Sequence, residues 1–339
     1  MKSLRLLKSN LVKMCFISVA MIASACNYAS VESERILEKG IQQYNENHLD
    51  QAMATFKDAL DRDPNNDQAL FYMAKIDMHY RDFHQASQKI EQALGIDNKP
   101  SYWYLLGTSQ KGEADLMFAD SKFDDSEMLY LKCVYSLNQA VKIDPWYTEA
   151  WLEMAHCQIG AKEYADASKS FQKSIESNPT YKSGSGVTAH YKELGELYAR
   201  FGYHREAMMV LTNGLMNNPS DGQLEVILAD VYAAMGEYTD ALTHYEGAYK
   251  VLKIMDHSKV SALSAMYGAG LVNFEIARKD DAQGNREKAA ESYKKAREWF
   301  DEYSTAAAPL ENEKIRRSDA LNKMKRIDLF MESVPKGGE

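Results

Sequence analysis

Four cysteines and eight histidines are the side chains of this 339-residue sequence whose types could support metal binding, redox or acid–base chemistry. Their spacings match no zinc pattern, no CxxC pair and no HExxH motif. No G-x-S-x-G elbow occurs, and the run Ser183-Gly184-Ser185-Gly186 lacks the Lys-Ser/Thr ending of a phosphate-binding loop. We therefore expect no catalytic residues, no metal site and no cofactor.

One acidic segment has the composition of a calcium-binding loop. Asp61, Asp63 and Asn65 alternate along it as oxygen ligands would. Its sixth position is Asn66 where the sharp turn of such a loop needs Gly, and its twelfth is Tyr72 where a bidentate Glu is needed. The segment is better interpreted as a polar turn between helices.

The chain is acidic as a whole. It holds 40 Lys and Arg against 49 Asp and Glu, a formal net charge of −9. An acidic surface repels phosphate backbones, so we expect no nucleic-acid partner. Only 7 prolines and 18 glycines interrupt the sequence, which favours a helical chain, and the length favours two domains or an elongated array.

The first 25 residues differ from the rest. They begin with four basic side chains and no acidic one, at Lys2, Arg5, Lys8 and Lys13. The apolar run over residues 14–23 is too short to cross a bilayer, which takes about 20 residues. Small residues follow it, so the layout predicts a cleaved secretory signal at residues 1–25. Its removal takes away four positive charges, and the net charge changes from −9 to −13.

The segment Ala23-Ser24-Ala25-Cys26 resembles the bacterial lipobox, with Ala23 in the place of the usual Leu. The resemblance implies that Cys26 is diacylated and begins the mature chain, with residues 26–32 as a tether to a durable membrane anchor. Asn27 is not the Asp that retains such lipoproteins in the inner membrane, so the resemblance favours the outer membrane, facing the periplasm. Two alternatives remain, an ordinary signal peptide and an uncleaved anchor.

A period of 34 residues organises most of the remaining chain. Three pairs of small residues keep this spacing: Ala52 and Ala86, Cys133 and Ala167, and Ala207 and Ala241. Two motifs recur at the expected first helices: Trp103, Leu106 and Gly107 form W-x-x-L-G, and Leu194, Gly195 and Tyr198 form L-G-x-x-Y. This pattern resembles the tetratricopeptide (TPR) repeat, in which each repeat is a pair of antiparallel helices.

The resemblance implies an all-α fold, an α-solenoid of about seven TPR helix-turn-helix repeats over residues 33–308. The repeats fall at roughly 33–66, 67–100, 101–146, 148–181, 188–221, 222–255 and 260–303. Small residues such as Gly107 and Gly195 should lie where two helices cross closely. Residues 309–339 should form a capping helix and tail, and the apolar face of this helix would carry Ala320, Leu321, Met324, Ile327 and Met331.

Three spacings exceed the period. They are 47 residues from Ala86 to Cys133, 40 from Ala167 to Ala207, and 48 from Ala241 to Ala289. The first excess predicts longer helices or a longer loop within the third repeat. The second contains the Gly/Ser run and predicts a flexible joint at residues 182–187.

Cys133 and Cys157 fall on the second helix of the third repeat and the first helix of the fourth, which should pack together. A disulfide between them is one arrangement that fits an oxidising compartment. We favour the other arrangement, two buried thiols, because Cys133 occupies a small-residue position of the repeat.

In the TPR family the first helices of successive repeats line a binding groove. The family's groove positions correspond here to Phe71, Tyr72, Lys75, His79, Tyr104, Thr108, Leu152, His156, Lys192, Glu196, Arg200 and Asp230. The first half of this row is aromatic and the middle is charged, which suits a protein or peptide partner. The Lys/Asn clamp with which some relatives hold a C-terminal carboxylate is missing from these rows.

The resemblances together imply a membrane-anchored TPR scaffold that binds other envelope proteins or peptide segments and assists the assembly of an outer-membrane complex. An accessory lipoprotein of a polysaccharide export system is the alternative. An enzyme is the third reading, and the sequence offers no active-site constellation for it.

Overall fold

The computed structural model describes residues 30–183, 186–255 and 260–334. The predicted signal sequence, Cys26, the first part of the tether, residues 184–185 of the predicted joint and the last five residues lie outside the described residues. The chain divides into two compact units within one helix, between Ser170 and Phe171.

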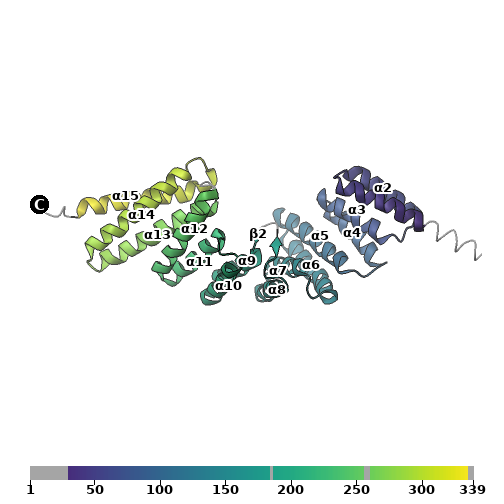
Figure 1. Ribbon diagram of the computed structural model, residues 1–339, viewed down its shortest axis with the longest axis horizontal. Helices are drawn as coiled ribbons and strands as arrows, with labels where there is room; N and C mark the ends of the chain where they lie inside the picture. The colour runs from purple at the N-terminus through teal and green to yellow at the C-terminus, as the bar shows by residue number, and fades with distance from the viewer. Residues whose placement is uncertain (1–29, 184–185, 256–259, 335–339) are drawn as a thin grey trace, which may run out of the picture. The chain divides into compact units, whose positions relative to one another are not determined.

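Helices joined by short turns make up the first unit (Figure 1). Residues 30–45 are helical, and they are followed by α2 (Leu49–Arg62), α3 (Asp67–His79), α4 (Phe83–Leu94), α5 (Pro100–Ala119), α6 (Phe123–Ile143), α7 (Thr148–Gly160) and α8 (Tyr164–Ser177), within which the unit ends. Neighbouring helices from α2 to α7 pack against each other in chain order. Each turn leaves too few residues for any other arrangement than a helical hairpin.

The second unit repeats the same plan. After a two-residue antiparallel ladder, β1 (Lys182–Ser183) with β2 (Gly186–Val187), come α9 (Ala189–Arg200), α10 (His204–Asn217), α11 (Gly222–Met235), α12 (Tyr238–Met255), α13 (Val260–Ala282), α14 (Arg286–Ala306), a 3₁₀ turn (Glu311–Glu313) and α15 (Lys314–Ser333). Over the described residues the helices form seven successive pairs and one final helix. The prediction of an all-α TPR-type solenoid with a capping helix is confirmed.

Close helix crossings depend on small residues, as the repeat pattern predicts. A Cβ added to Gly107 of α5 would lie 2.6 Å from Cγ of Leu137 in α6. A Cβ on Gly195 of α9 would lie 2.5 Å from Cδ2 of Leu211 in α10. Both distances are shorter than real carbon contacts, so glycine is required at these two crossings.

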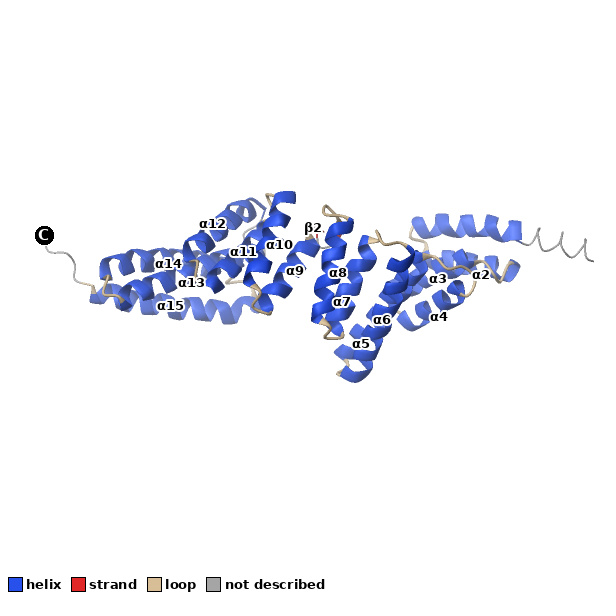
Figure 2. Ribbon diagram, turned by 90° about the horizontal axis from the view of Figure 1, so that it is seen from below, coloured by secondary structure: helices blue, strands red, loops and turns tan. Residues whose placement is uncertain are grey.

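The excess residues of the third repeat lengthen its helices and leave its turn short. The helices α5 and α6 have 20 and 21 residues, against 13 in α3 and 12 in α4. The small residue that is fourth in α2 and α4 is eleventh in α6, where it is Cys133. Seven added residues are about two helical turns, so the apolar stripe keeps its orientation. In Figure 2 the α5–α6 pair extends past the neighbouring α3–α4 pair.

The capping helix α15 differs from the prediction in two residues. Ala320 and Ile327 are fully buried and Met324 packs partly on the core, as predicted. Leu321 and Met331 are 38% and 40% exposed, so their placement on the buried face is wrong. Leu321 lies about 100° around the helix from Ala320. In the last turn, Phe330 makes the core contact, 4.7 Å from the ring of Tyr293.

Among the described residues, α13 is the one helix long and apolar enough to cross a membrane. Most of its apolar window is buried inside the second unit. It packs between α12 and α14. A helix that is apolar on all sides and covered by its neighbours is a core helix of a folded domain, and α13 has that place here.

Candidate functional site

The first helices of the first unit carry a half-buried aromatic cluster, which consists of Tyr44, Phe71 and Tyr72 with Lys75. The Nζ atom of Lys75 lies 4.9 Å from the ring centre of Tyr44, 5.3 Å from that of Tyr72 and 5.6 Å from that of Phe71. These distances allow cation–π attraction. Within the described ranges, no carboxylate lies within ion-pair distance of Lys75.

The rings of the aromatic cluster are held by the core below them. Tyr72 stacks on the fully buried Phe56 at 5.5 Å, and Phe71 lies 5.0 Å from Tyr102. His79, one turn past Lys75 on α3, is exposed, with its ring edge toward Tyr80. The cluster is therefore a fixed surface, and its side chains lose little rotamer freedom when something binds to them.

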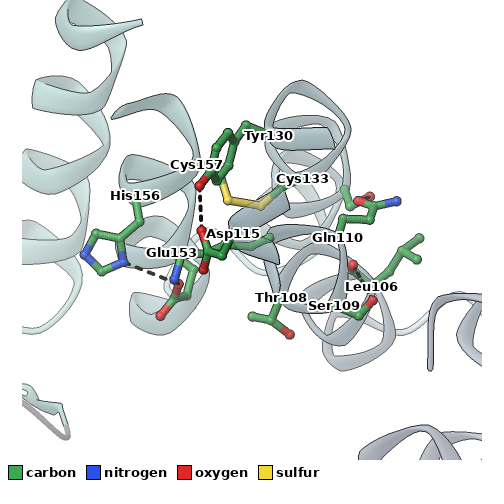
Figure 3. The surroundings of a disulfide bond; sticks show 12 residues. Leu106, Thr108, Ser109, Gln110, Asp115, Tyr130, Cys133, Glu153, His156 and Cys157 are labelled. Carbon is green, nitrogen blue, oxygen red and sulfur yellow. Dashed lines mark hydrogen bonds and ion pairs between the residues drawn. A yellow bond between two sulfur atoms is a disulfide. The ribbon is translucent and has the colours of Figure 1, made fainter. Parts of the chain in front are cut away.

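Further along the first unit, α5 and α7 present polar groups. Glu153 of α7 lies 3.3 Å from Nζ of Lys111 in α5 and 3.3 Å from Nδ1 of His156, the contact drawn in Figure 3. Burial acts to raise the pKa of Glu153, but the hydrogen bond with His156 and the charge of Lys111 outweigh it and hold the pKa below its ordinary value. This carboxylate is therefore ionised at neutral pH.

Three predicted groove residues of α5 and α7 have mixed placements. Tyr104 is half-buried, with its ring 5.1 Å from that of Tyr147. The Thr108 hydroxyl donates to the carbonyl of Leu105 in its own helix, at 3.1 Å. Leu152 is only 4% exposed, so it packs inside the protein and offers almost no surface to a partner.

In the second unit the predicted residues form a charged row. Lys192 of α9 donates a hydrogen bond to Oε1 of Gln223 in α11, at 3.3 Å. Arg200, the last residue of α9, is exposed. Asp230 of α11 accepts a hydrogen bond from the Tyr245 hydroxyl. Although Glu196 and Asp230 keep solvent access, the surrounding helices raise the pKa of both carboxyl groups by burial. The negative charge of Asp230 also raises the pKa of Glu196.

Sequence reasoning missed Tyr44, Lys111 and Glu153. Tyr44 lies at the twelfth position of the repeat that begins at residue 33, one of the family's groove positions, so extending the same rows to the first repeat finds it. Glu153 is sixth in the repeat that begins at residue 148, as Tyr72 is in the repeat that begins at residue 67, so the same rows also find it. The contact between Lys111 and Glu153 could not be found in this way, because it depends on the lateral packing of two helices.

Cys133 and Cys157 form a disulfide, so the favoured expectation of two buried thiols is wrong. The bond joins α6 to α7, and both residues are fully buried (Figure 3). Packing brings the two Cα atoms to 6.2 Å, inside the range that a disulfide needs.

Over residues 30–183, 186–255 and 260–334, no group of three or more His, Cys, Asp or Glu side chains is placed to hold a metal ion. The titratable groups of the first-helix surfaces are distributed along the helices. They do not converge on one point where a nucleophile, a base and an oxyanion donor would have to meet. Within each unit, these described groups instead form a row along successive first helices.

Two segments match known families. Residues 43–108 and residues 148–181 each match a tetratricopeptide repeat. No curated protein matches the sequence.

Several solved structures are similar to this chain at low sequence identity. The C-terminal part of a TPR repeat-containing protein from Cytophaga hutchinsonii is 16% identical, with a TM-score of 0.59 over 81% of this chain and 99% of that one. Pseudomonas aeruginosa pilF is 13% identical, with a TM-score of 0.49 over 70% and 96%. MamA from Desulfovibrio magneticus is 14% identical, with a TM-score of 0.46 over 56% and 96%. Residues 43–108 and 148–181 are therefore similar to tetratricopeptide repeats, and the Cytophaga structure shares the fold of successive helical pairs.

Proposed function

We propose that this protein is a lipid-anchored TPR scaffold of the bacterial envelope, which binds a segment of another protein on the first helices of its first unit. The observation that carries the proposal is the aromatic cluster. Its three rings and one lysine are fixed, half-buried and unoccupied by any carboxylate of the described residues. Rigid aromatic side chains beside a cation are typical anchors of protein interfaces.

The chemistry of the cluster favours a partner segment with an apolar side chain next to an acidic one. The apolar side chain would cover the rings, and the carboxylate would pair with Lys75. Desolvation of the lysine by the partner would strengthen this ion pair relative to one at an open surface.

The anchor is proposed from the sequence of the first 26 residues, with Cys26 as the lipidated residue, the outer membrane as its site and the assembly of an outer-membrane complex as its setting. The disulfide adds an independent reason for export, because such bonds persist in the periplasm and are rare in a reducing cytosol. It does not distinguish between the two membranes.

Site-specific photocrosslinking tests the proposed surface. A photoreactive phenylalanine at His79, beside the aromatic cluster, should capture a defined peptide segment in intact cells. The variant Lys75→Gln should lower the yield by about tenfold, the effect of an anchor worth about 1.4 kcal/mol. The matched variant Lys142→Gln, at an exposed lysine of α6, should leave the yield unchanged. An unchanged yield in Lys75→Gln would contradict the proposal.

A further inference from the structure

A groove lies between α4 and α6, the second helices of the second and third repeats. It is on the opposite side of α5 from the predicted binding residues Tyr104 and Thr108. Its floor is formed by Trp103, Leu106 and Gln110 of α5. One wall is formed by Glu91 and Leu94 of α4 with Gly95 directly after it, and the other by Met128, Leu131, Lys132, Tyr135 and Ser136 of α6. The cavity volume is about 660 Å³, and it lies wholly within the first unit.

The α6 wall is an apolar stripe that no neighbouring helix covers. Met128, Leu131 and Tyr135 are 59%, 45% and 61% exposed, and they follow one another at i, i+3 and i+7. Tyr135 lies edge-on to the ring of Trp103, at 6.3 Å, so wall and floor are continuous. The core stripe of α6 runs through other residues, including Leu137, so this helix has two apolar faces.

Only the start of this stripe belongs to the lengthened part of the third repeat. Because Cys133 has the register of Ala86, Met128 is among the seven residues added at the start of α6. Leu131 and Tyr135 lie in the part of α6 that corresponds to α4, which forms the other wall and leaves both side chains exposed. A contiguous exposed apolar surface of this kind is uncommon on a chain that has no partner.

The two walls carry opposite charges at the rim. Glu91 lies on α4 and Lys132 on α6, both are exposed, and neither makes an ion pair with any of the described residues. A lipid surface would have to desolvate Glu91, which argues against membrane insertion at this face. A protein segment with a basic residue on the flank beside Glu91 and an acidic residue on the flank beside Lys132 would form an ion pair with each.

From this geometry we infer that the α4–α6 groove is a second docking site, whose occupant is one amphipathic α-helix of a partner protein. The walls are helices whose backbone groups are already hydrogen-bonded, so they offer no free edge to an extended strand. A helix brings its own satisfied backbone and an apolar stripe that packs against α6. Its basic flank faces Glu91 and its acidic flank faces Lys132, which fixes the direction in which it lies.

Photocrosslinking in native membranes, followed by sequencing of the captured peptide, tests the site. The photoreactive residue replaces Tyr135, and the control replaces Tyr203, an equally exposed tyrosine of the second unit. We expect Tyr135 to capture one segment with apolar residues spaced by three and four, a basic residue on one flank and an acidic residue on the other. The synthetic peptide of that segment is then titrated against the purified chain.

Matched variants decide whether the peptide binds in the groove. Leu131→Glu should weaken peptide binding at least about tenfold, while Leu321→Glu, at an exposed leucine of α15, should not. The exchange variant Glu91→Lys with Lys132→Glu should lose the peptide and regain binding to a version with its two flanks exchanged. Lys75→Gln should have no effect, which separates this site from the aromatic cluster.

Several outcomes would overturn the inference. They are a captured segment without helical apolar spacing, crosslinks only to lipid or only to a second copy of the chain, and no capture at Tyr135 above the level at Tyr203. Equal peptide binding by wild type and Leu131→Glu would do so as well.

Discussion

Tyrosines of second helices donate hydrogen bonds to carboxylates of first helices at a fixed separation. Tyr130 donates to Asp115 and Tyr245 to Asp230, and both pairs are 15 residues apart in sequence. Burial, and then the bond to Asp115, raises the pKa of Tyr130 to about 12. Each pair joins the two helices of one repeat near their turn, so a polar contact supplements the apolar crossing there.

The disulfide is expected to contribute about 3 kcal/mol to the stability of the first unit, since its cysteines are 24 residues apart. Replacing both cysteines, Cys133→Ala with Cys157→Ala, should lower the free energy of unfolding by that amount and shift the urea midpoint to a lower concentration, because alanine fits both buried helical positions. Reductant should bring the wild type to the same midpoint and leave the double variant unchanged. A wild-type midpoint that is insensitive to full reduction would show that the bond contributes no stability.

The buried His190 should make the second unit less stable in mild acid. Burial lowers the pKa of this imidazole, although the nearby carbonyl of Pro179 and the charge of Glu193 act in the opposite direction. Below about pH 6.5 the unfolded chain therefore binds a proton that the native His190 does not. Stability should be complete above that pH and should fall as the pH falls toward the native pKa.

The measurement is the urea midpoint at pH 7.5 and at pH 5.5. His190→Phe should reduce the fall in the urea midpoint from pH 7.5 to pH 5.5. His79→Gln, at an exposed histidine, should not. The raised pKa values of Glu196 and Asp230 give a contribution of opposite sign, which is common to all three chains and cancels in the comparison. An equal fall in the urea midpoint in wild type and His190→Phe would show that groups other than His190 cause the pH dependence.

At the scale of elements, replacing a helical glycine with alanine distinguishes close helix crossings from open ones. Gly107→Ala should destabilise the first unit by about 1 kcal/mol or more, because overpacking against Leu137 costs about 1–3 kcal/mol and exceeds the gain in helix propensity. Gly247→Ala in α12 should stabilise by about 0.5–1 kcal/mol, since the nearest atom to its new Cβ is 4.0 Å away. Chemical denaturation of both variants checks this, and stabilisation by Gly107→Ala would mean a looser crossing.

The helical pairs could be predicted from the sequence because the 34-residue period recurs between Ala52 and Ala86, Cys133 and Ala167, and Ala207 and Ala241, and because small residues such as Gly107 and Gly195 mark close crossings. Whether the added residues of the third repeat lengthen its loop or its two helices could not be predicted, since they fit equally well into either. The Cys133–Cys157 bond depends on which faces of α6 and α7 meet, and no spacing encodes that.

The groove could have been found in part. Met128, Leu131 and Tyr135 have helical spacing, and a second apolar stripe on one helix is visible in the sequence. What the sequence lacks is the placement of α4 opposite them, which forms the second wall and leaves the three side chains exposed. Leu152 is buried although it was predicted to line the binding groove. The alignment with the repeat family assigns a residue to a helix face only to within one residue.

At the scale of the whole molecule, the lipid anchor should decide where the chain resides. Under the proposed lipidation, Cys26→Ser should move the protein from the membrane fraction toward the soluble periplasmic fraction wherever its signal is still removed, because several acyl chains bind a bilayer durably. Fractionation and mass spectrometry of the N-terminus measure this. Cys133→Ser is the control, which should stay in the membrane, and a wild-type chain without acyl groups on Cys26 would exclude lipidation as the anchor.

A protein held by one end and attached to a partner elsewhere is subject to tension. In a stack of helical pairs each pair contacts only its neighbours, so pairs would pull out one after another as force rises. The covalent link from α6 to α7 shields the 24-residue stretch between its cysteines from extension. At about 3.5 Å per residue, an oxidised chain stretched to its full contour would be shorter than a reduced one by about 80 Å.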